Sequence, residues 1–528
     1  MSAAHDPCNR GVILSGRSSG DCEKTRGRWI LAATILASSM AFIDGTVVNV
    51  ALPFLQKELT ATAIGVQWVV ESYSLFLAAL LLVGGSLGDR YGRRRIFLIG
   101  VVIFAVASAL CGFAQSIGQL IVARAAQGIG GALLVPGSLA IITASFSKDQ
   151  RGKAIGTWSG FSAMTTAIGP VLGGWLVEHF SWRAVFFLNI PVAIAVLVIS
   201  IWRVPESREK DQHGSLDWVG AILITVGLGG VVYGLIESSR VGFSNSVVLG
   251  CLIAGAVIVA LFFVNEAHAK SPMVPLTLFQ SRDFAGTNLL TLFLYAALSG
   301  TFFFFTLNLI QVQHYSATAA GSALLPFVVI MFSLSRWSGG LMDRFGPRLP
   351  LMIGPLIASV GFALFAVPTV NANYWKTFFP AVVVLGIGMA ISVAPLTTTV
   401  MGSVDSERSG IASGINNAVS RAAGLMAIAV FGVLMIHSFS RELSARLAEL
   451  PLSDEIRIAL NGQVVRLGGI EISNNLDSAT RGALSEAIGN SFVSSFRLIM
   501  FVSVGLAILS ALSSWWLIGR RSSTAKSS

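Results

Sequence analysis

The octapeptide GSLGDRYG at residues 85–92 returns later in the chain as GGLMDRFG at residues 339–346. The aspartates of the two copies lie 343 − 89 = 254 residues apart. A second pair of related segments, GKAIG at 152–156 and GIASG at 410–414, repeats after 414 − 156 = 258 residues. Because two motifs recur at nearly the same offset, the sequence predicts two related halves of parallel topology.

The composition is that of an integral membrane protein. Hydrophobic residues make up 54% of the 528 residues and charged residues only 12%, whereas soluble domains carry about 25% charged residues. The apolar residues fall in blocks of about 20, the length that an α-helix needs to cross a bilayer. We therefore predict an all-α membrane protein with about fourteen spans. Their predicted limits are 29–52, 66–87, 96–114, 118–144, 154–177, 183–202, 217–237, 246–265, 285–310, 319–341, 349–367, 376–400, 410–437 and 497–519.

The repeat divides these spans into two six-helix bundles and two inserted helices. Arginine and lysine concentrate in the short loops on one side, which the positive-inside rule places in the cytoplasm together with both termini. Residues 438–495 are the only long segment outside the membrane, and their amphipathic patches predict a pair of helices lying on the membrane surface. The predicted segments are an N-terminal tail (1–28), the N-terminal bundle (29–202), a linker with the two inserted helices (203–270), five helices of the C-terminal bundle (271–437), the extracytoplasmic loop (438–495), the last membrane helix (496–519) and a cytoplasmic tail (520–528).

Residue patterns of several other function classes are missing from the sequence. The net charge of +10 is spread over short loops, so it does not predict nucleic-acid binding. The four cysteines and six histidines have no metal-binding or disulfide spacing, and no phosphate-binding GxxxxGK[ST] loop occurs. No set of side chains suggests hydrolysis. We therefore predict a transporter that is not an enzyme, has no cofactor and uses an ion gradient.

Asp44 is a charged residue inside the apolar stretch 29–55. An ionisable side chain costs several kcal/mol in hydrocarbon, so proteins keep one there mostly to carry ions or protons. The alternative is a carboxylate that only holds two helices together. Arg124 in the fourth span needs a partner of its own, and Asp44 is the candidate in the same half. If the two touch, Arg124 competes with a proton for the carboxylate, and their separation lets the proton bind.

Glu71, near the end of the second span, is a further candidate for proton or substrate coupling, although it could simply reach the membrane interface. It lies in a helix that is otherwise largely apolar.

The repeated octapeptide itself predicts a gating latch. Its glycines permit a tight turn, and Asp89 stands among arginines at a helix end, where it can bind basic groups in one state and release them in another. An ordinary basic turn would not explain why the pattern returns at Asp343. The predicted members of the latch are Gly85, Asp89, Arg90, Gly92, Arg93, Asp343 and Arg344.

The fifth span contains Gly169-Pro170-Val-Leu-Gly173-Gly174. Gly169 and Gly173 share a helix face and permit close packing, while Pro170 removes a backbone hydrogen bond and can kink the helix. Small-residue packing without a functional role is the alternative.

A second group of polar residues is a candidate lining for a substrate cavity. Asn417 and Arg421 are four residues apart and so share one helix face. They could contact substrate or bond to another helix. The candidates are Asn49, Gln127, Asn416, Asn417 and Arg421.

The ordered set of motifs resembles the major facilitator superfamily, and within it the fourteen-spanning drug:proton antiporters of the EmrB/QacA kind. The resemblance covers roughly residues 29–520 and is most specific between Asp44 and Pro191. Further matching patterns are Trp182-Arg-x-x-Phe-x-x-Asn-x-Pro191, Leu216-Asp-Trp-x-Gly220 and Pro272-x-x-Pro-Leu-x-Leu-Phe279.

The resemblance implies export of amphipathic, often cationic, drugs or toxic metabolites across the inner membrane in exchange for protons. It implies a proton or cation site at Asp44, proton coupling by Arg124, gating by Asp89 and Arg93, and an antiporter motif at Gly169 and Pro170. A periplasmic adaptor and an outer-membrane channel are candidate partners. Two departures stand out: Thr165-Thr166 replaces an earlier Gly-Pro of the family, and Glu71 occupies a position that is usually uncharged.

Three alternatives stay open from the sequence. One is a proton-coupled uptake symporter of the same fold, against which Gly169-Pro170 argues. Another is an exporter of one specific metabolite or lipid. The last is a receptor or lipid-handling scaffold that transports nothing, which the intact coupling residues disfavour.

Overall fold

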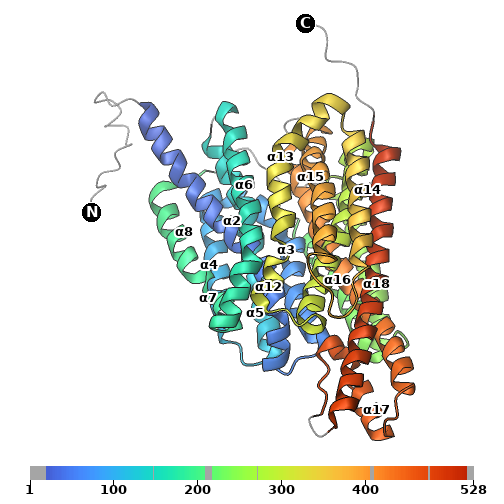
Figure 1. Ribbon diagram of the computed structural model, residues 1–528. Helices are drawn as coiled ribbons and strands as arrows, with labels where there is room; N and C mark the ends of the chain where they lie inside the picture. The colour runs from blue at the N-terminus through green and yellow to red at the C-terminus, as the bar shows by residue number, and fades with distance from the viewer. Residues whose placement is uncertain are drawn as a thin grey trace.

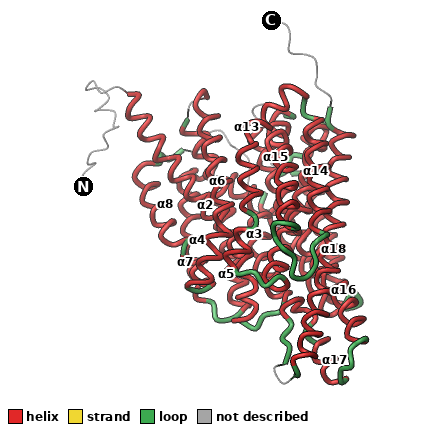
Figure 2. Tube along the Cα trace, viewed as in Figure 1, coloured by secondary structure: helices red, strands yellow, loops and turns green. Residues whose placement is uncertain are grey.

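A computed structural model of the chain describes residues 19–146, 148–207, 217–269, 272–404, 409–473 and 476–519. Within these ranges the protein consists of helices and loops, without a strand (Figure 2). Thirteen helices in the described part are long and apolar enough to cross a membrane. A further helix of 32 residues, α6, packs along α2. The prediction of an all-α integral membrane protein is confirmed.

The first half of the chain forms one bundle. Its elements are α2 (Ser19–Glu58), α3 (Ala63–Tyr91), α4 (Arg93–Phe113), α5 (Ile117–Ser145), α6 (Lys148–His179), α7 (Trp182–Phe187) and α8 (Asn189–Arg203). The two inserted helices are α9 (Trp218–Val241) and α10 (Ser246–His268).

The second half forms the other bundle, with a small helical unit at one end. Its elements are η1 (Leu276–Gln280), α11 (Arg282–Leu307), η2 (Asn308–Val312), α12 (Ala317–Ser322), α13 (Leu325–Phe345), α14 (Arg348–Phe365), α15 (Phe378–Gly402), α16 (Ser409–Ala448), α17 (Asp454–Asn461), η4 (Val464–Gly469) and α18 (Ser478–Leu517).

Two predicted spans are each divided into a short and a long helix. Pro191 is the third residue of α8, and Pro326 is the second residue of α13. Because proline has no backbone N–H, neither can donate to the carbonyl one turn earlier, so the helix is interrupted just before it. The predicted span 285–310 also ends differently, since α11 passes into the π-helical turn η2 at Asn308.

The predicted surface helices of segment 438–495 are instead extensions of the membrane helices. α16 continues to Ala448 and α18 begins at Ser478, with α17 and η4 between them (Figure 1). Leu443 and Leu447, which belong to one amphipathic patch of this segment, are fully buried in the protein core. An amphipathic pattern reports one apolar face, and here that face packs against protein. We call this end of the molecule the loop end.

The two bundles meet along α3 and α16 and along α6 and α12. The inserted helix α9 packs against both α3 and α16, so it covers one seam between the halves. At the end opposite the loop end, where Ser19 and Leu517 lie, α2 slants away from α13 and α15 (Figure 1). The halves are therefore most closely joined toward the loop end.

Candidate functional site: a buried carboxylate network

Asp44 lies in the interior of the first bundle, on α2, and is completely buried. Its carboxylate forms an ion pair with the Arg124 guanidinium of α5. It also accepts hydrogen bonds from Gln127 Nε2 at 2.9 Å and from Asn189 Nδ2 at 3.3 Å. Because three side chains donate to it, the carboxylate has the polar surroundings that an ionised group needs away from water.

The Arg124 guanidinium is equally well enclosed. Its Nε donates to the Val69 carbonyl at 3.1 Å, and its Nη1 donates to Gln127 Oε1 at 2.7 Å. Its Cζ lies 4.2 Å from the centre of the Tyr73 ring, which adds a cation–π contact. The structure thus brings Asp44, Arg124 and Gln127 into one network that joins α2, α3 and α5.

Asn189 is a member of this network that the sequence analysis did not single out. It is the first residue of α8, and its amide bridges Asp44 and the Ser108 hydroxyl, which lies 3.0 Å away on α4. Ser108 in turn donates to the Phe186 carbonyl at 2.8 Å. The available signal was an amide in an apolar span, two residues before the helix-interrupting Pro191.

Glu71 is fully buried on α3 and stands apart from this network. Neither carboxyl oxygen has a hydrogen-bond partner in the described part of the chain.

The repeated octapeptide adopts a defined structure in the first half. Arg93 Nε donates to Asp89 Oδ1 at 2.7 Å. The backbone amides of Arg94 and Arg95 donate to the Glu206 carboxylate at 3.0 and 3.1 Å, so Glu206 caps the start of α4. Gly92 has φ of 109°, a backbone conformation that favours glycine. Glu206 was not predicted, because a capping acid 112 residues away leaves no local pattern.

Two further arginines of the predicted latch contact aromatic rings. Arg90 and Arg344 each lie over the aromatic ring of the next residue, at 5.6 and 5.3 Å. The side chain of Asp343 lies outside the described part, so the latch of the second half stays a prediction.

The glycines of α6 allow this helix to contact α2 and α12 closely. A Cβ at Gly169 would lie 2.2 Å from Thr46 Oγ1, and one at Gly173 would lie 2.2 Å from Val47 Cγ2, so both allow α6 to approach α2 beside Asp44. A Cβ at Gly174 would lie 2.4 Å from the Ala317 carbonyl oxygen of α12. The motif therefore links the region of Asp44 to the second bundle.

The residues predicted to line a substrate cavity do not form one cluster. Asn416 donates to Thr291 at 2.7 Å within its own bundle, and Asn417 donates to the Ser413 carbonyl of its own helix at 3.0 Å. Arg421 faces the other bundle, with its Cζ 6.0 Å from the Phe42 ring centre. Asn49 is half-buried on α2, and Gln127 belongs to the Asp44 network.

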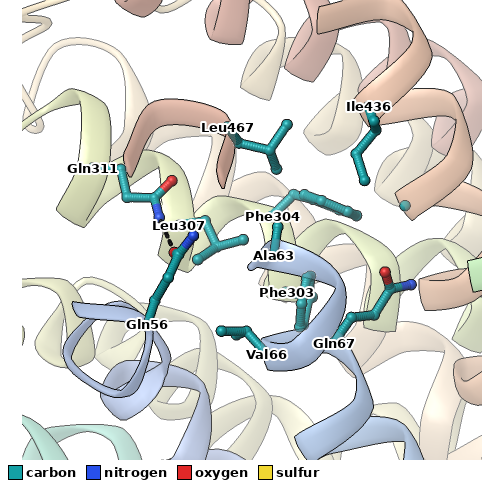
Figure 3. A pocket seen from close by; sticks show the side chains of 11 residues that line it. Gln56, Ala63, Val66, Gln67, Phe303, Phe304, Leu307, Gln311, Ile436 and Leu467 are labelled. Carbon is teal, nitrogen blue, oxygen red and sulfur yellow. Dashed lines mark hydrogen bonds between the residues drawn. The ribbon is translucent and has the colours of Figure 1, made fainter. Parts of the chain in front are cut away.

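Side chains from both bundles meet at the loop end. Gln311 Nε2 donates to Gln56 Oε1 at 2.9 Å, and Gln56 Nε2 donates to the Arg466 carbonyl of η4 at 3.3 Å. Figure 3 shows the small pocket between the bundles, with Leu467 above its phenylalanine and valine lining. Leu467 is 2% exposed, so η4 closes this end of the boundary between the halves.

Comparison with known proteins places this geometry in a family. The family model described as Major Facilitator Superfamily matches residues 34–428. The Tetracenomycin C resistance and export protein of Streptomyces glaucescens is 33% identical, over 94% of this chain and 93% of that protein. The multidrug resistance protein Stp of Mycobacterium tuberculosis is 31% identical, over 92% and 91%.

The fold is shared with solved structures of very different sequence. A bacterial homolog of the human lysosomal transporter Spinster, in an inward-facing and unoccupied conformation, has a TM-score of 0.63 at 18% identity, covering 94% of this chain and 99% of that one.

Proposed function

The chain belongs to the Major Facilitator Superfamily, and from this premise we propose that it is a proton-coupled exporter of drugs and other toxic amphipathic compounds. It is a multi-pass membrane protein of a family of transporters, not of enzymes. Its relatives are named for export of tetracenomycin C and for multidrug resistance, which supports export as the direction of transport. The proton gradient supplies the energy, with no cofactor.

The observation that carries the proposal is the buried Asp44–Arg124 pair. Arg124, Gln127 and Asn189 all donate to the Asp44 carboxylate, and Arg124 is its countercharge. A movement that draws Arg124 away would leave a buried anion, which is stable only after it takes up a proton. Proton binding and the arrangement of α2 against α5 are thereby linked, and this linkage is what couples a proton gradient to transport.

The arrangement of the bundles supports alternating access. The contacts of Gln56, Gln311 and η4 close the loop end, while α2 diverges from α13 and α15 at the other end. We assign the loop end to the outside and both termini to the cytoplasm, because the basic loops lie at the terminal end. Substrate would enter from the cytoplasm or inner leaflet and leave at the loop end.

The proposal includes the location of the protein and its partners. The protein resides in the inner (cytoplasmic) membrane, and a periplasmic adaptor with an outer-membrane channel is a candidate partner. A second candidate function is export of one specific compound. Similarity to the Tetracenomycin C resistance and export protein, which is named for a single compound, favours it. Uptake in symport with protons is the remaining alternative.

The test is Asp44→Asn in inside-out vesicles energised by respiration. Addition of a substrate drug should release protons from vesicles containing the unaltered protein, and the variant should release none while it is inserted and folded. Asp454→Asn is the matched control, because Asp454 is 91% exposed on α17. Unchanged proton release by Asp44→Asn would refute the assignment. A panel of dyes, biocides and antibiotics in a strain without its own pumps separates multidrug from single-compound export.

A further inference from the structure

Glu71 lies where α3 of the first bundle, α16 of the second bundle and the inserted helix α9 meet. Gln67, one turn earlier on α3, donates to the Ile428 carbonyl of α16 at 2.8 Å. Leu82, three turns later on the same face, approaches Gly414 of α16, where a Cβ would lie 3.2 Å away. Because residues at these spacings share one helix face, Glu71 faces α16 of the second bundle.

The inserted helix α9 closes the third side. Trp68 packs against Tyr233 of α9, with ring centres 6.1 Å apart and planes tilted by 45°. Leu75 lies beside Gly229 of α9, where an added Cβ would be 3.3 Å from it. These residues flank Glu71 on the side next to α16. The carboxyl group therefore lies at the junction of α3, α16 and α9, and α9 stands between it and the surrounding lipid.

Charged and titratable side chains on the neighbouring helices have other partners. Arg124 on α5 pairs with Asp44 on α2, and Glu237 on α9 pairs with Arg240. Tyr73 on α3 donates to the Ala41 carbonyl, and Tyr233 on α9 packs against Trp68. The other groups also have neighbours: Arg421 on α16 faces the Phe42 ring, His437 lies edge-to-face with Phe243, Cys111 on α4 approaches Gln127, and Arg466 on η4 pairs with Glu471. None of these groups supplies a countercharge to Glu71.

Among the described carboxyl groups, Glu71 alone has both oxygens buried and unpartnered. An ionised carboxylate in that position would have neither hydrogen-bond donors nor a countercharge, and burial of such a group is prohibitively unfavourable. The surroundings of Glu71 therefore favour the neutral, protonated acid in this conformation.

We propose that Glu71 is a second proton-binding site, set at the sliding contact between α3 and α16. This inference rests on the proposed function and adds one transported proton to the one exchanged at Asp44. Movement of the second bundle past α3 opens the junction, and the carboxyl group exchanges its O–H proton with water on the side then open. The proton is taken from outside water and released to the cytoplasm, and no other bond changes.

The first test detects the proton itself and needs no substrate. Infrared spectroscopy of the purified protein in lipid should show the carbonyl absorption of a protonated carboxylic acid. Glu71→Gln should remove it, because the amide keeps the shape of the neutral acid without its proton, and should leave the melting temperature unchanged. Glu237→Gln, a carboxyl group on the neighbouring α9 that is paired with Arg240, should not affect it. An unaltered absorption in Glu71→Gln would overturn the proposal.

The second test measures the number of protons exchanged per substrate molecule in proteoliposomes. This number is obtained from the membrane potential at which net exchange stops. Glu71→Gln should lower this number by about one and retain transport, while Asp44→Asn abolishes exchange. Equal proton numbers in Glu71→Gln and unaltered protein would overturn the second site and leave the proposed function standing. Absence of exchange in the unaltered protein would instead count against the proposed function, whatever the infrared result.

Discussion

Gly169 on α6 lies against Thr46 on α2, two residues from Asp44, so closely that a Cβ at position 169 would lie 2.2 Å from the Thr46 hydroxyl oxygen. Real Cβ atoms do not approach other heavy atoms to this distance. The glycine is therefore required for the present position of α2 against α6, and through α2 for the position of the Asp44 carboxylate.

Gly169→Ala should consequently impair transport even though it adds a single methyl group. Overpacking of this kind costs about 1–3 kcal/mol, and α2 must shift to relieve it. The measurement is drug-dependent proton release in inside-out vesicles. Because the nearest atom is the Thr46 hydroxyl and the next, the Ile43 carbonyl oxygen, is 3.3 Å away, the double variant Gly169→Ala/Thr46→Ala should recover most of the activity. Failure of this rescue would show that the contact does not control transport.

The Asp44–Arg124 pair predicts a strong non-additivity in stability. Arg124→Gln leaves a buried carboxylate without its countercharge, a change that costs about 3–5 kcal/mol. Asp44→Asn/Arg124→Gln removes both charges and should be much closer to the unaltered protein in unfolding experiments in detergent. Additive losses in the double variant would mean that the two charges do not stabilise each other.

The contact between Gly174 and α12 predicts a way to open the loop end. Gly174→Val should force α6 and α12 apart, because the atoms nearest to a new side chain are backbone atoms of Ala317 and Thr318. A cysteine introduced at Val66, 1% exposed in the pocket between the bundles, should then react faster with a membrane-impermeant maleimide, in a background without the native cysteines.

Gly250→Val is the matched control for this substitution. Gly250 lies on α10, and a Cβ there would meet nothing within 4 Å. Equal labelling rates in Gly174→Val and Gly250→Val would contradict the closed loop end proposed for this conformation.

Some of the site followed from the sequence because electrostatics leaves few choices in a membrane. Two opposite charges in apolar spans of the same half have to be compensated, and Asp44 and Arg124 are indeed in contact. The spans themselves followed from hydropathy, because an α-helix forms all its backbone hydrogen bonds within one segment and can therefore cross lipid alone. The orientation of the protein and the segment limits stay predictions.

Other features depended on contacts that leave no local pattern. The Asn189 amide and the Glu206 carboxylate act on partners 145 and 112 residues away. The sequence of either residue's own segment does not identify these partners. The amphipathic patches of segment 438–495 suggested surface helices, whereas Leu443 and Leu447 are buried in protein. An amphipathic pattern does not distinguish burial in protein from burial in lipid. Glu71 was a candidate from the sequence, but its complete burial and its lack of a partner required the structure.

Leu467 provides the last prediction, which concerns the seal at the loop end. It lies in η4 with φ 55° and ψ −130°, a backbone conformation that non-glycine residues rarely adopt, and its side chain is nevertheless buried over the pocket (Figure 3). Burial of this side chain between the bundles offsets the backbone strain. Truncation of a buried leucine costs about 2–5 kcal/mol of stability. At Leu467 this change should weaken the contact of η4 with Gln56 and Gln311.

Leu467→Ala should therefore favour the conformation with an open loop end and raise maleimide labelling of a cysteine at position 66. Ile458→Ala, in the neighbouring α17, is the control, since Ile458 is 73% exposed and its truncation should alter stability by less than about 0.5 kcal/mol. If η4 merely rests on the surface, both variants will label at the rate of the unaltered protein. If η4 holds the outside closed, the cysteine at position 66 will be labelled faster only in Leu467→Ala. A substrate added from the cytoplasmic side will then change that rate, because the two bundles move relative to each other during transport.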